Sequence, residues 1–446
     1  MSLDAKQTES QPIGSVSELE SIFRSAERTT GKLLLGLEHE RLLFPLQGAD
    51  PVPYEGVSGV GAVLTGFASK GFSEIREAAD KPVIAMQRGT ETLSLEPGGQ
   101  FELSGSPFAT AREAQAENLK HASELKDVLS KLNLRAVTLG YRPFTELSAM
   151  PWMPKSRYRV MRETLGARGK LAHHMMLMTA TGQVSLDWRD EADCVKKIVT
   201  SARISPVLVG LYANSPIAQG KKVGAQSFRS QVWNDVDPAR CGYPNAMLDG
   251  SFSYRAYVDW ALDAPLLFLR RDGGYLAPKL TFREFLKSGF EGKPATSSDW
   301  IDHLSTLFPE VRIKKVLEIR AADCNSPAMT GALGAVMRGI LYDATALDEA
   351  GRLIAMSSPA EHRALHARAQ VDGLGAVIQG KRTLADAARE LVQIAAGGLK
   401  RLGDDDVSLL EPLREIATRG TSPAVEVLKH FDAEKDPAKF LSRFAI

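Results

Sequence analysis

Cysteine is scarce in this sequence, and long apolar runs are missing. Three cysteines, Cys194, Cys241 and Cys324, are spread over 446 residues, which excludes a disulfide framework and gives no ligand spacing for a structural zinc site. No apolar run approaches the roughly 20 residues needed to span a bilayer, and the first dozen residues lack the apolar segment of a signal peptide. We therefore expect a soluble protein of a reducing compartment, the cytoplasm, with no membrane partner.

An excess of charge of one sign is also absent. Lys and Arg number 55 and Asp and Glu number 54, so the formal net charge is +1. The basic residues are evenly scattered, which excludes the positive patch typical of a nucleic-acid-binding or membrane-surface protein. The hydrophobic content of 44% is sufficient for a large core. We expect small molecules as partners of a chain that is a monomer or a weak homodimer.

The spacing of apolar residues predicts strands and helices in irregular order. Strands are expected at 33–44, 134–140, 172–188, 265–271 and 314–323, with a hairpin at 90–105 around a Pro-Gly-Gly turn. Helices are expected at 14–30, 56–71, 109–132, 190–213, 251–263 and 299–307, and throughout a C-terminal part of about 328–446. This order lacks βαβ regularity and favours the α+β class. A loose polar tail, 1–13, would precede a single catalytic domain, 14–446.

The stretch GLEHERLLF, residues 36–44, places two carboxylates in an otherwise apolar strand. Glu38 and Glu40 are two residues apart, so in a strand they share one face while His39 lies on the other. Two like charges on a half-buried face repel each other and lose hydration. A group that neutralises them is therefore expected nearby.

Other predicted strands also carry carboxylates. Glu96 and Glu102 lie on either side of the hairpin turn, and Glu318 and Arg320 are two residues apart in KKVLEIR. Glu is depleted from strands, so its repeated use there needs a reason. One alternative is cross-strand salt bridging on a solvated face. The whole set favours instead a hard-oxygen site for Mg²⁺ or Mn²⁺, with Arg320 facing a transferring phosphoryl group. No P-loop motif is present.

Several longer segments resemble glutamate–cysteine ligases of the plant and proteobacterial type. They include LEPGGQFELSGSP (95–107), MPKSRYRVMRETL (153–165), SFRSQVWNDVDPAR (227–240) and FPEVRIKKVLEIRAAD (308–323). The resemblance implies a curved, largely antiparallel sheet that forms a catalytic funnel with helices outside, as in the glutamine-synthetase-like carboxylate–amine ligases. It also implies the glutathione-biosynthesis reaction in which ATP, L-glutamate and L-cysteine give γ-glutamylcysteine, ADP and phosphate.

The resemblance also implies roles for individual residues. The ligands of Mg²⁺ or Mn²⁺ would be Glu38, Glu40, Glu96, Glu102, Gln183 and Glu318. Arg320 would be the catalytic residue that stabilises phosphoryl charge, and Arg320 and Lys314 would contact the nucleotide ATP. Arg157 and Arg229 would bind substrate carboxylates, for which a bidentate guanidinium suits better than an ammonium group.

The chain departs from the family at positions that we expect to lie near the substrates. Met178 and Ser185 stand where related strands carry Arg and Asn, Leu267 replaces a plant Tyr, and 324–327 replaces a GGPW segment. An apolar pocket discriminates poorly among acceptors, so another amine or amino acid is an alternative to cysteine. An ammonia-using ligase, a kinase that stops at the acyl phosphate and a catalytically silent homologue are further alternatives. The plant regulatory cysteine pair is missing, so weak redox control is expected.

Overall fold

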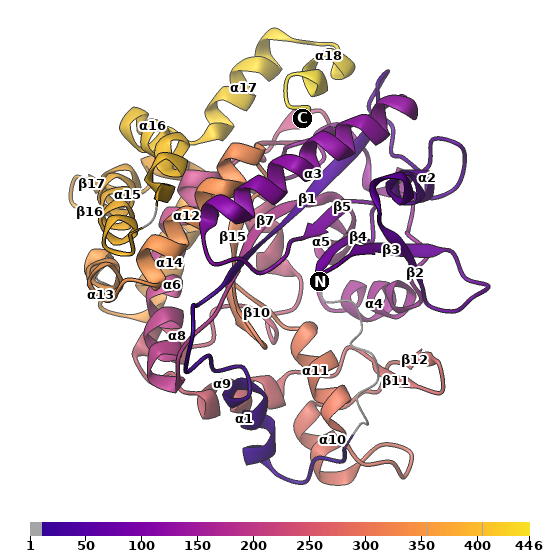
Figure 1. The fold of residues 1–446 in the computed structure, drawn as a ribbon, viewed down its shortest axis with the longest axis vertical. Coiled ribbons are helices and arrows are strands. Elements are labelled where there is room, and N and C mark those ends of the chain that lie inside the picture. Colours follow the sequence, from indigo (N-terminus) through magenta and orange to yellow (C-terminus); the bar gives the residue numbers. More distant parts are fainter. Residues whose placement is uncertain (1–10, 355, 404) are drawn as a thin grey trace.

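A nine-stranded sheet forms the centre of the molecule (Figure 1). The computed structural model describes residues 11–354, 356–403 and 405–446. Within these ranges the strand order is β14-β15-β7-β1-β5-β4-β3-β2, with β6 beside the C-terminal half of β1, and every pair in this sheet is antiparallel. The strands are β1 (Leu35–Pro45), β2 (Ser73–Arg76), β3 (Val83–Arg88), β4 (Glu91–Leu95), β5 (Phe101–Ser104), β6 (Leu134–Val137), β7 (Thr181–Leu186), β14 (Val311–Ile313) and β15 (Leu317–Asp323). The predicted α+β class with a largely antiparallel sheet is confirmed.

Strand β1 is central because it is long enough to pair with three other strands. Its residues 35–39 pair with β7, residues 38–41 pair with β5, and residues 42–45 pair with β6. Since directly opposed residues of an antiparallel pair point to the same face, this register fixes which side chains meet. Two polar pairs result, because Glu38 lies opposite Gln183 and Glu40 lies opposite Glu102.

One face of the sheet is covered by helices. Helix α12 (Pro327–Leu341) contacts β1 and β7, α3 (Ala111–Lys131) contacts β1 and α12, and α6 (Glu191–Tyr212) contacts β15. Nearly all of α12 is buried, as expected for a helix that lies between a sheet and outer helices. The outer helix α15 (Leu384–Arg401) packs on α12. Side chains that point to this face therefore form a continuous core.

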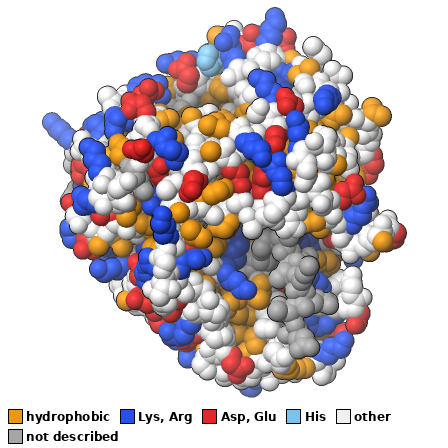
Figure 2. Space-filling model, viewed as in Figure 1, with side chains coloured by type: hydrophobic (Ala, Val, Ile, Leu, Met, Phe, Trp, Pro, Cys, Tyr) orange, Lys and Arg blue, Asp and Glu red, His pale blue; other side chains and the backbone are white. Residues whose placement is uncertain are grey.

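The other face is bordered by α4 (Ser156–Gly166), α5 (Ala172–Met178), α7 (Phe228–Val232) and the 3₁₀ turn η3 (Trp233–Asp235). The remaining helices are α1 (Val16–Arg24), α2 (Val60–Gly66), α8 (Ala246–Asp249), α9 (Tyr254–Asp263), α10 (Phe282–Ser288), α11 (Ser297–Ser305), α13 (Ala344–Leu353), α14 (Pro359–Asp372), α16 (Glu411–Arg419), α17 (Pro423–Ala433) and α18 (Pro437–Ser442). None of the helices in the described ranges is long and apolar enough to cross a bilayer. Acidic and basic side chains are interspersed on the face drawn in Figure 2.

Two of the predicted elements differ clearly from the structure. Residues 172–188 are not one strand, because the apolar stretch AHHMMLM forms α5 and only 181–186 is strand; a short apolar run does not distinguish the two by its period. Of the predicted strand 265–271, only β11 (Leu269–Arg271) is extended, in a separate ribbon with β12 (Gly274–Leu276). The predicted helical C-terminal part is confirmed, with one small ribbon, β16 (Val377–Gln379) and β17 (Arg382–Thr383).

The predicted polar tail, 1–13, falls mostly outside the described residues, since 1–10 are not described. Its last residues are anchored. Ile13 is buried, and its N–H donates to the carbonyl oxygen of Ala295 at 2.9 Å. The N–H of Ser297 in turn donates to the carbonyl oxygen of Gln11 at 2.9 Å, so this segment contacts the start of α11.

Candidate active site

The predicted carboxylates gather on the sheet face opposite the helix layer. Glu38 and Glu40 of β1 point to this face, as does Glu102 of β5, which lies directly opposite Glu40. His39 points to the other face, where its ring lies 5.5 Å from that of His121 in α3. The alternation expected from GLEHERLLF is therefore confirmed.

Three carboxylates form a compact cluster at one end of this face. Each of Glu40, Glu96 and Glu102 offers an oxygen that lies within 4.8 Å of the other two. Glu96 joins the cluster because β4 ends at Leu95 and the chain then turns tightly. In that turn the N–H of Glu96 donates to the carbonyl of Gln100 at 3.0 Å, and the N–H of Gly99, which has φ +79°, donates to the carbonyl of Glu96 at 2.9 Å.

The three carboxylates of this cluster differ in their electrostatics: burial opposes ionisation of each, but positive charge that includes Lys155 lowers the pKa of Glu102, whereas the pKa values of Glu40 and Glu96 are raised. Burial, followed by repulsion from Glu102, raises the pKa of Glu96 to about 7. Burial together with the charges of Glu96 and Glu102 raises the pKa of Glu40 well above its ordinary value. The buried Oε1 atom of Glu96 has no hydrogen-bond partner among the described residues. Clustered carboxylate oxygens with an orphaned buried acceptor match the donor set that Mg²⁺ or Mn²⁺ takes.

The opposite end of the face is rich in positive charge. The Arg312 guanidinium holds Glu318 with two hydrogen bonds, of 2.6 Å from Nε and 3.0 Å from Nη2. Arg320 Nη1 donates to Glu318 Oε2 at 2.9 Å, and Lys314 Nζ lies 3.6 Å from Glu318 Oε1. Although burial opposes ionisation, these three cations hold the pKa of Glu318 well below its ordinary value. Glu318 is thus an ion-paired carboxylate outside the compact cluster.

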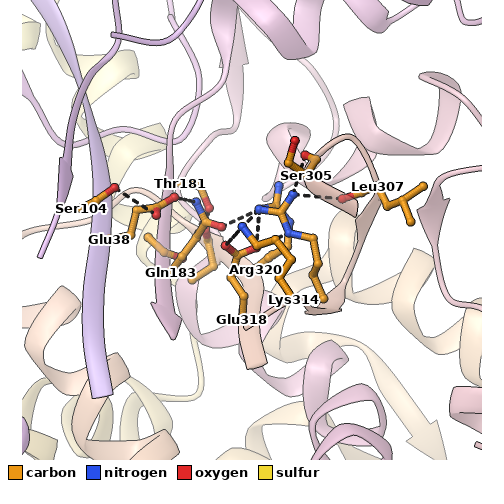
Figure 3. A network of polar contacts seen from close by, with 12 residues as sticks. Glu38, Ser104, Thr181, Gln183, Ser305, Leu307, Lys314, Glu318 and Arg320 are labelled. Atoms are coloured by element: carbon orange, nitrogen blue, oxygen red, sulfur yellow. Dashed lines mark hydrogen bonds and ion pairs between the residues drawn. The ribbon is translucent and has the colours of Figure 1, made fainter. Parts of the chain in front are cut away.

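The side chain of Gln183 connects the two ends (Figure 3). Its Nε2 donates to Glu38 Oε1 at 2.7 Å, and its Oε1 accepts from Arg320 Nη1 at 2.6 Å. Figure 3 shows Glu38, Gln183, Arg320 and Glu318 in one continuous row across neighbouring strands. These contacts fix the orientation of the amide, because its nitrogen only donates and its oxygen only accepts.

The two predicted carboxylate-binding arginines border the same region. Arg229 lies on α7, whose N-cap is Ser227; its Nη2 donates to the carbonyl of Arg320 at 2.9 Å, while its buried Nε has no partner among the described residues. Arg157 lies on α4, and its charge opposes the rise in the pKa of Glu96. Both guanidinium groups are therefore near the clustered carboxylates.

Most of these groups line a cavity of about 60 Å³. Its lining includes Glu38, Glu40, Glu96, Glu102, Gln183, Arg312 and Arg320, together with an apolar wall of Met161, Met175, Met176, Trp233 and Phe308. Met178 and Leu267 are fully buried. Neither they nor Ser185 and Cys324 are among the described residues that line this cavity, although Ser185 lies opposite Glu318 and therefore shares the sheet face of Gln183.

Several residues of the site are not evident from the sequence pattern. Arg312 lies opposite Glu318 in the β14–β15 hairpin, and the short loop of VRIKKVLEI could have revealed this pairing. Ser94 and Ser104 donate to Glu102 Oε1 at 3.1 and 3.2 Å. In the sequence, only their spacing of two residues from Glu96 and Glu102 indicates that they share a face with these carboxylates. Lys155, which donates to the carbonyl of Leu95 at 2.7 Å, gives no such signal.

Comparison with known proteins places this arrangement in context. A sequence model described as glutamate–cysteine ligase family 2 (GCS2) matches residues 34–440. The chloroplastic glutamate–cysteine ligases of Brassica juncea and Arabidopsis thaliana are each 35% identical to the chain over 421 residues; the match covers 94% of this chain and 81% and 80% of theirs.

Two solved structures share the fold. A glutamate–cysteine ligase of Francisella tularensis, crystallised with AMP, superposes with a TM-score of 0.55 at 12% identity, covering 94% of this chain and 92% of that one. A bifunctional glutathione synthetase of Pasteurella multocida gives a TM-score of 0.54 at 14% identity, covering 96% of this chain and 53% of that one. The sheet and its helix layer therefore recur in enzymes of distant sequence.

Proposed function

This chain belongs to glutamate–cysteine ligase family 2, and we propose that it joins the γ-carboxylate of L-glutamate to the amine of L-cysteine with ATP as co-substrate. The products are γ-glutamylcysteine, ADP and phosphate. The observation that carries the proposal is the sheet face on which the Glu40–Glu96–Glu102 cluster faces the cationic end at Arg320. Such a face can hold two anionic reactants that would otherwise repel each other.

In the first step an oxygen of the glutamate γ-carboxylate attacks the γ-phosphorus of ATP, and ADP leaves. We assign Arg320 and Lys314 to the transferring phosphoryl group, because positive charge placed in advance stabilises the negative charge that develops there. Arg320 is oriented for this role by Gln183 and Glu318. Trp233 lies alongside, with its ring centroid 5.7 Å from the guanidinium carbon of Arg320.

In the second step the amine attacks the carbonyl carbon of γ-glutamyl phosphate, and phosphate leaves. Arg229 and Arg157 would hold substrate carboxylates and so fix the distance between the reacting atoms. The buried Nε–H of Arg229, which has no partner among the described residues, supports this role. The sheet and bordering helices together supply these groups, so we propose that residues 14–446 act as one catalytic domain.

We assign a divalent cation, Mg²⁺ or Mn²⁺, to Glu40, Glu96 and Glu102, with Glu38 and Gln183 beside them and Glu318 at the cationic end. The orphaned Glu96 oxygen and the raised pKa values of Glu40 and Glu96 support this assignment. When bound, the cation supplies charge neutralisation to the phosphates and to the attacking carboxylate. The three carboxylates would hold it at their end of the sheet face.

We further propose that the enzyme works in the cytoplasm, a reducing compartment, as a monomer or a weak homodimer. Cys194, Cys241 and Cys324 are all free thiols, which supports weak redox control. The large exposed apolar side chains of the described residues are dispersed along the chain, at Leu46, Val57, Leu119, Leu276, Val371 and Val377. Dispersed apolar residues of this kind do not favour a large permanent interface.

The test is a measurement of kcat/KM for cysteine, 2-aminobutyrate, alanine, serine and ammonium. ADP release is the readout, and mass spectrometry confirms each product. Cysteine is expected to exceed every other amine. A non-thiol amine preferred by more than about tenfold, roughly 1.4 kcal/mol, would replace cysteine as acceptor while leaving the ligase chemistry. If no amine accelerated ADP release, the ligase proposal itself would be wrong.

A further inference from the structure

Asp323, the last residue of β15, is a buried carboxylate that neither reaction step uses. The residue is 1% exposed. It is not among the described residues that line the cavity of about 60 Å³ between the carboxylates, which we call the catalytic cavity. Burying a carboxylate is unfavourable unless other groups compensate its charge. The groups around Asp323 therefore indicate its role.

A β-bulge in β15 turns Asp323 toward the sheet face that carries the carboxylates. Between Ile319 and Ala322 the register against β7 shifts by one residue. The alternation of β15 would otherwise direct Asp323 to the helix layer. With the bulge, Asp323 lies opposite Thr181, which is two residues from Gln183 and so shares its face. Bulges often re-aim a side chain in this way near active sites.

Three donors fix both oxygens of the Asp323 carboxylate. Oδ2 accepts hydrogen bonds from the hydroxyl of Ser215 at 2.6 Å and from the backbone N–H of Asn214 at 2.8 Å. Oδ1 accepts a hydrogen bond from the hydroxyl of Ser227 at 2.7 Å. Such short distances are typical of hydrogen bonds to a carboxylate. A neutral amide could not take its place fully, because the amide nitrogen donates and does not accept.

The same two hydroxyl groups hold the start of α7. Ser227 is the N-cap of this helix, and its oxygen accepts a hydrogen bond from the N–H of Ser230 at 3.2 Å. The oxygen of Ser215 accepts from the N–H of Arg229 at 3.0 Å. Because each hydroxyl donates its own proton to Asp323, its lone pairs are directed at α7. The carboxylate thus fixes the backbone from which Arg229 extends.

Charge also connects Asp323 with Arg229. Burial lowers the pKa of Arg229, and attraction to Asp323 is the largest effect that opposes this. Burial raises the pKa of Asp323, and attraction to Arg229 is the largest effect that opposes that rise. The guanidinium is held further by β15, since its Nη2 donates to the carbonyl of Arg320 at 2.9 Å. Both the backbone and the charge of Arg229 therefore depend on β15.

The packing around Asp323 holds it in this one position. A Cβ atom at Gly140 would lie 2.7 Å from Cβ and Cγ of Asp323, which is closer than such atoms approach, so only glycine fits there. The N–H of Gly140 donates to the carbonyl of Asn214 at 3.1 Å. Asp323 is enclosed by these segments, and it acts through its neighbours rather than by touching a substrate.

We propose that Asp323 is a positioning residue, which through Ser215, Ser227 and its own charge holds Arg229 where the guanidinium binds a substrate carboxylate. This inference rests on the proposed function, in which Arg229 has that role. A bidentate pair between a guanidinium and a carboxylate requires a fixed orientation. Loss of Asp323 therefore weakens the binding of one amino-acid substrate and leaves that of ATP nearly unchanged.

The test compares steady-state kinetics of full-length variants for each substrate. Arg229→Met first identifies the amino acid that Arg229 binds, as the substrate whose KM rises. Asp323→Asn keeps the shape of the side chain and is expected to raise the same KM at least tenfold. It should change kcat and the KM of ATP less than threefold. Combined with Arg229→Met, it should add less than threefold to that KM, because its effect passes through Arg229.

Ser215→Ala is a second variant that keeps the proposal testable if Asp323→Asn does not fold. It removes the hydroxyl between Asp323 and the N–H of Arg229 but leaves the carboxylate in place. We expect it to raise the same KM at least threefold.

Asp406→Asn is the matched control. Asp406 is also 1% exposed, and it accepts hydrogen bonds at the start of a helix, from the N–H of Ala111 at 2.8 Å and of Arg112 at 3.1 Å. It is not among the described residues that line the catalytic cavity. Asp406→Asn is expected to lower the Tm, as Asp323→Asn does, and to leave every KM unchanged.

A second readout does not depend on activity. In a ¹⁵N spectrum of arginine side chains, Arg229→Lys assigns the signal of the buried Arg229 Nε–H. Asp323→Asn and Ser215→Ala are expected to shift this signal and to speed its exchange with solvent at least tenfold. Asp406→Asn is expected to do neither.

Four results would overturn the proposal. They are an Arg229→Met variant in which no KM rises, an Asp323→Asn variant with an unchanged KM or Nε–H signal, an equal rise of KM in Asp406→Asn, and full multiplication of the two effects in the double variant. If the wild-type enzyme joined no amine to glutamate, the proposed function would be wrong. The exchange of the Nε–H signal would then still decide whether Asp323 holds Arg229.

Discussion

The two ends of the catalytic sheet face use the same residue type in opposite ways. Glu40, Glu96 and Glu102 lie together, and burial and mutual repulsion raise the pKa of Glu40 and of Glu96. Although burial opposes ionisation of Glu102 too, nearby positive charge that includes Lys155 and a hydrogen bond from Ser94 lower its pKa. Glu318 is equally buried but contacts three cations, which lower its pKa. The difference shows that a buried carboxylate on this face is either left for an outside cation or neutralised by the chain itself.

This division suits a reaction between two anions. The uncompensated end can accept a divalent cation together with the groups that this cation binds. The compensated end keeps Arg320 and Lys314 in fixed positions, because Glu318 anchors both. At the carboxylate cluster, positive charge arrives with ligands. At the other end, the positive charge of Arg320 and Lys314 is always present.

Among the variants that test this difference between the two ends, Glu40→Gln is expected to have the largest effect on activity. Loss of one ligand charge from the cluster should lower kcat/KM on the order of 1,000-fold, about 4 kcal/mol, while the metal-free protein becomes more stable because a repulsion is removed. Steady-state ADP release and thermal unfolding in EDTA measure the two effects. Glu390→Gln, on the surface of α15, is the control. Near-normal Mg²⁺-dependent turnover of the Glu40 variant would exclude Glu40 as a ligand.

At the compensated end the opposite effect on stability is expected. Arg312→Met removes the bidentate partner of Glu318 and should destabilise the protein by about 3 kcal/mol, since breaking a buried pair leaves a buried charge. Urea unfolding measures this. Arg414→Met breaks the exposed pair with Glu411 and should change stability by less than about 1 kcal/mol. Equal effects of the two variants would mean that Lys314 and Arg320 neutralise Glu318 without Arg312.

Period-2 patterns in the sequence were sufficient to predict which side chains share a face. Glu38, Glu40, Glu102 and Arg320 were placed correctly on strands of one sheet, because alternation in a strand is a local property. The pairing register is not local. The short β14–β15 hairpin could reveal that Glu318 lies opposite Arg312, but nothing in the order of residues shows that Glu40 lies opposite Glu102.

Local pattern also failed where a helix and a strand adjoin. The run AHHMMLMTATGQVSL reads as one apolar segment, but α5 ends at Thr179, whose backbone is extended (φ −87°, ψ 154°) and whose hydroxyl donates to the carbonyl of Met175 at 2.7 Å. The helix then places Met175 and Met176 in the wall of the catalytic cavity. The length of a helix inside an apolar run depends on tertiary packing, so these residues could not be assigned to the site from the sequence.

The dependence of stability on pH tests whether the Glu96 end of the face lacks compensating charge. The pKa of Glu96 is raised from 4.5 to about 7 in the folded state, so the folded protein binds extra protons between these values. Its contribution to stability is fully present below pH 4.5 and is lost as the pH rises through 7, by roughly 3 kcal/mol. In EDTA, Glu96→Gln should therefore exceed wild type in stability near pH 8 and match it near pH 4.5. Excess Mg²⁺ should abolish the difference or reverse it. A gap that does not change with pH would show that Glu96 is ionised without a metal.

The smallest expected effect concerns Gln183, which joins the two ends. Its amide donates to Glu38 and accepts from Arg320, so a Gln183→Glu substitution keeps the second contact and turns the first into a repulsion between carboxylates. The new charge also pairs with Arg320 and weakens its pull on the phosphoryl group. We expect kcat to fall about tenfold, roughly 1.4 kcal/mol, and less Mg²⁺ to be needed for half-maximal activity, since the cluster gains a negative neighbour.

Gln183→Met removes both contacts without adding charge, so it should lower kcat similarly while leaving the Mg²⁺ requirement unchanged or higher. If the two variants had the same Mg²⁺ requirement, charge at this position would not reach the metal cluster, and the two ends would act independently.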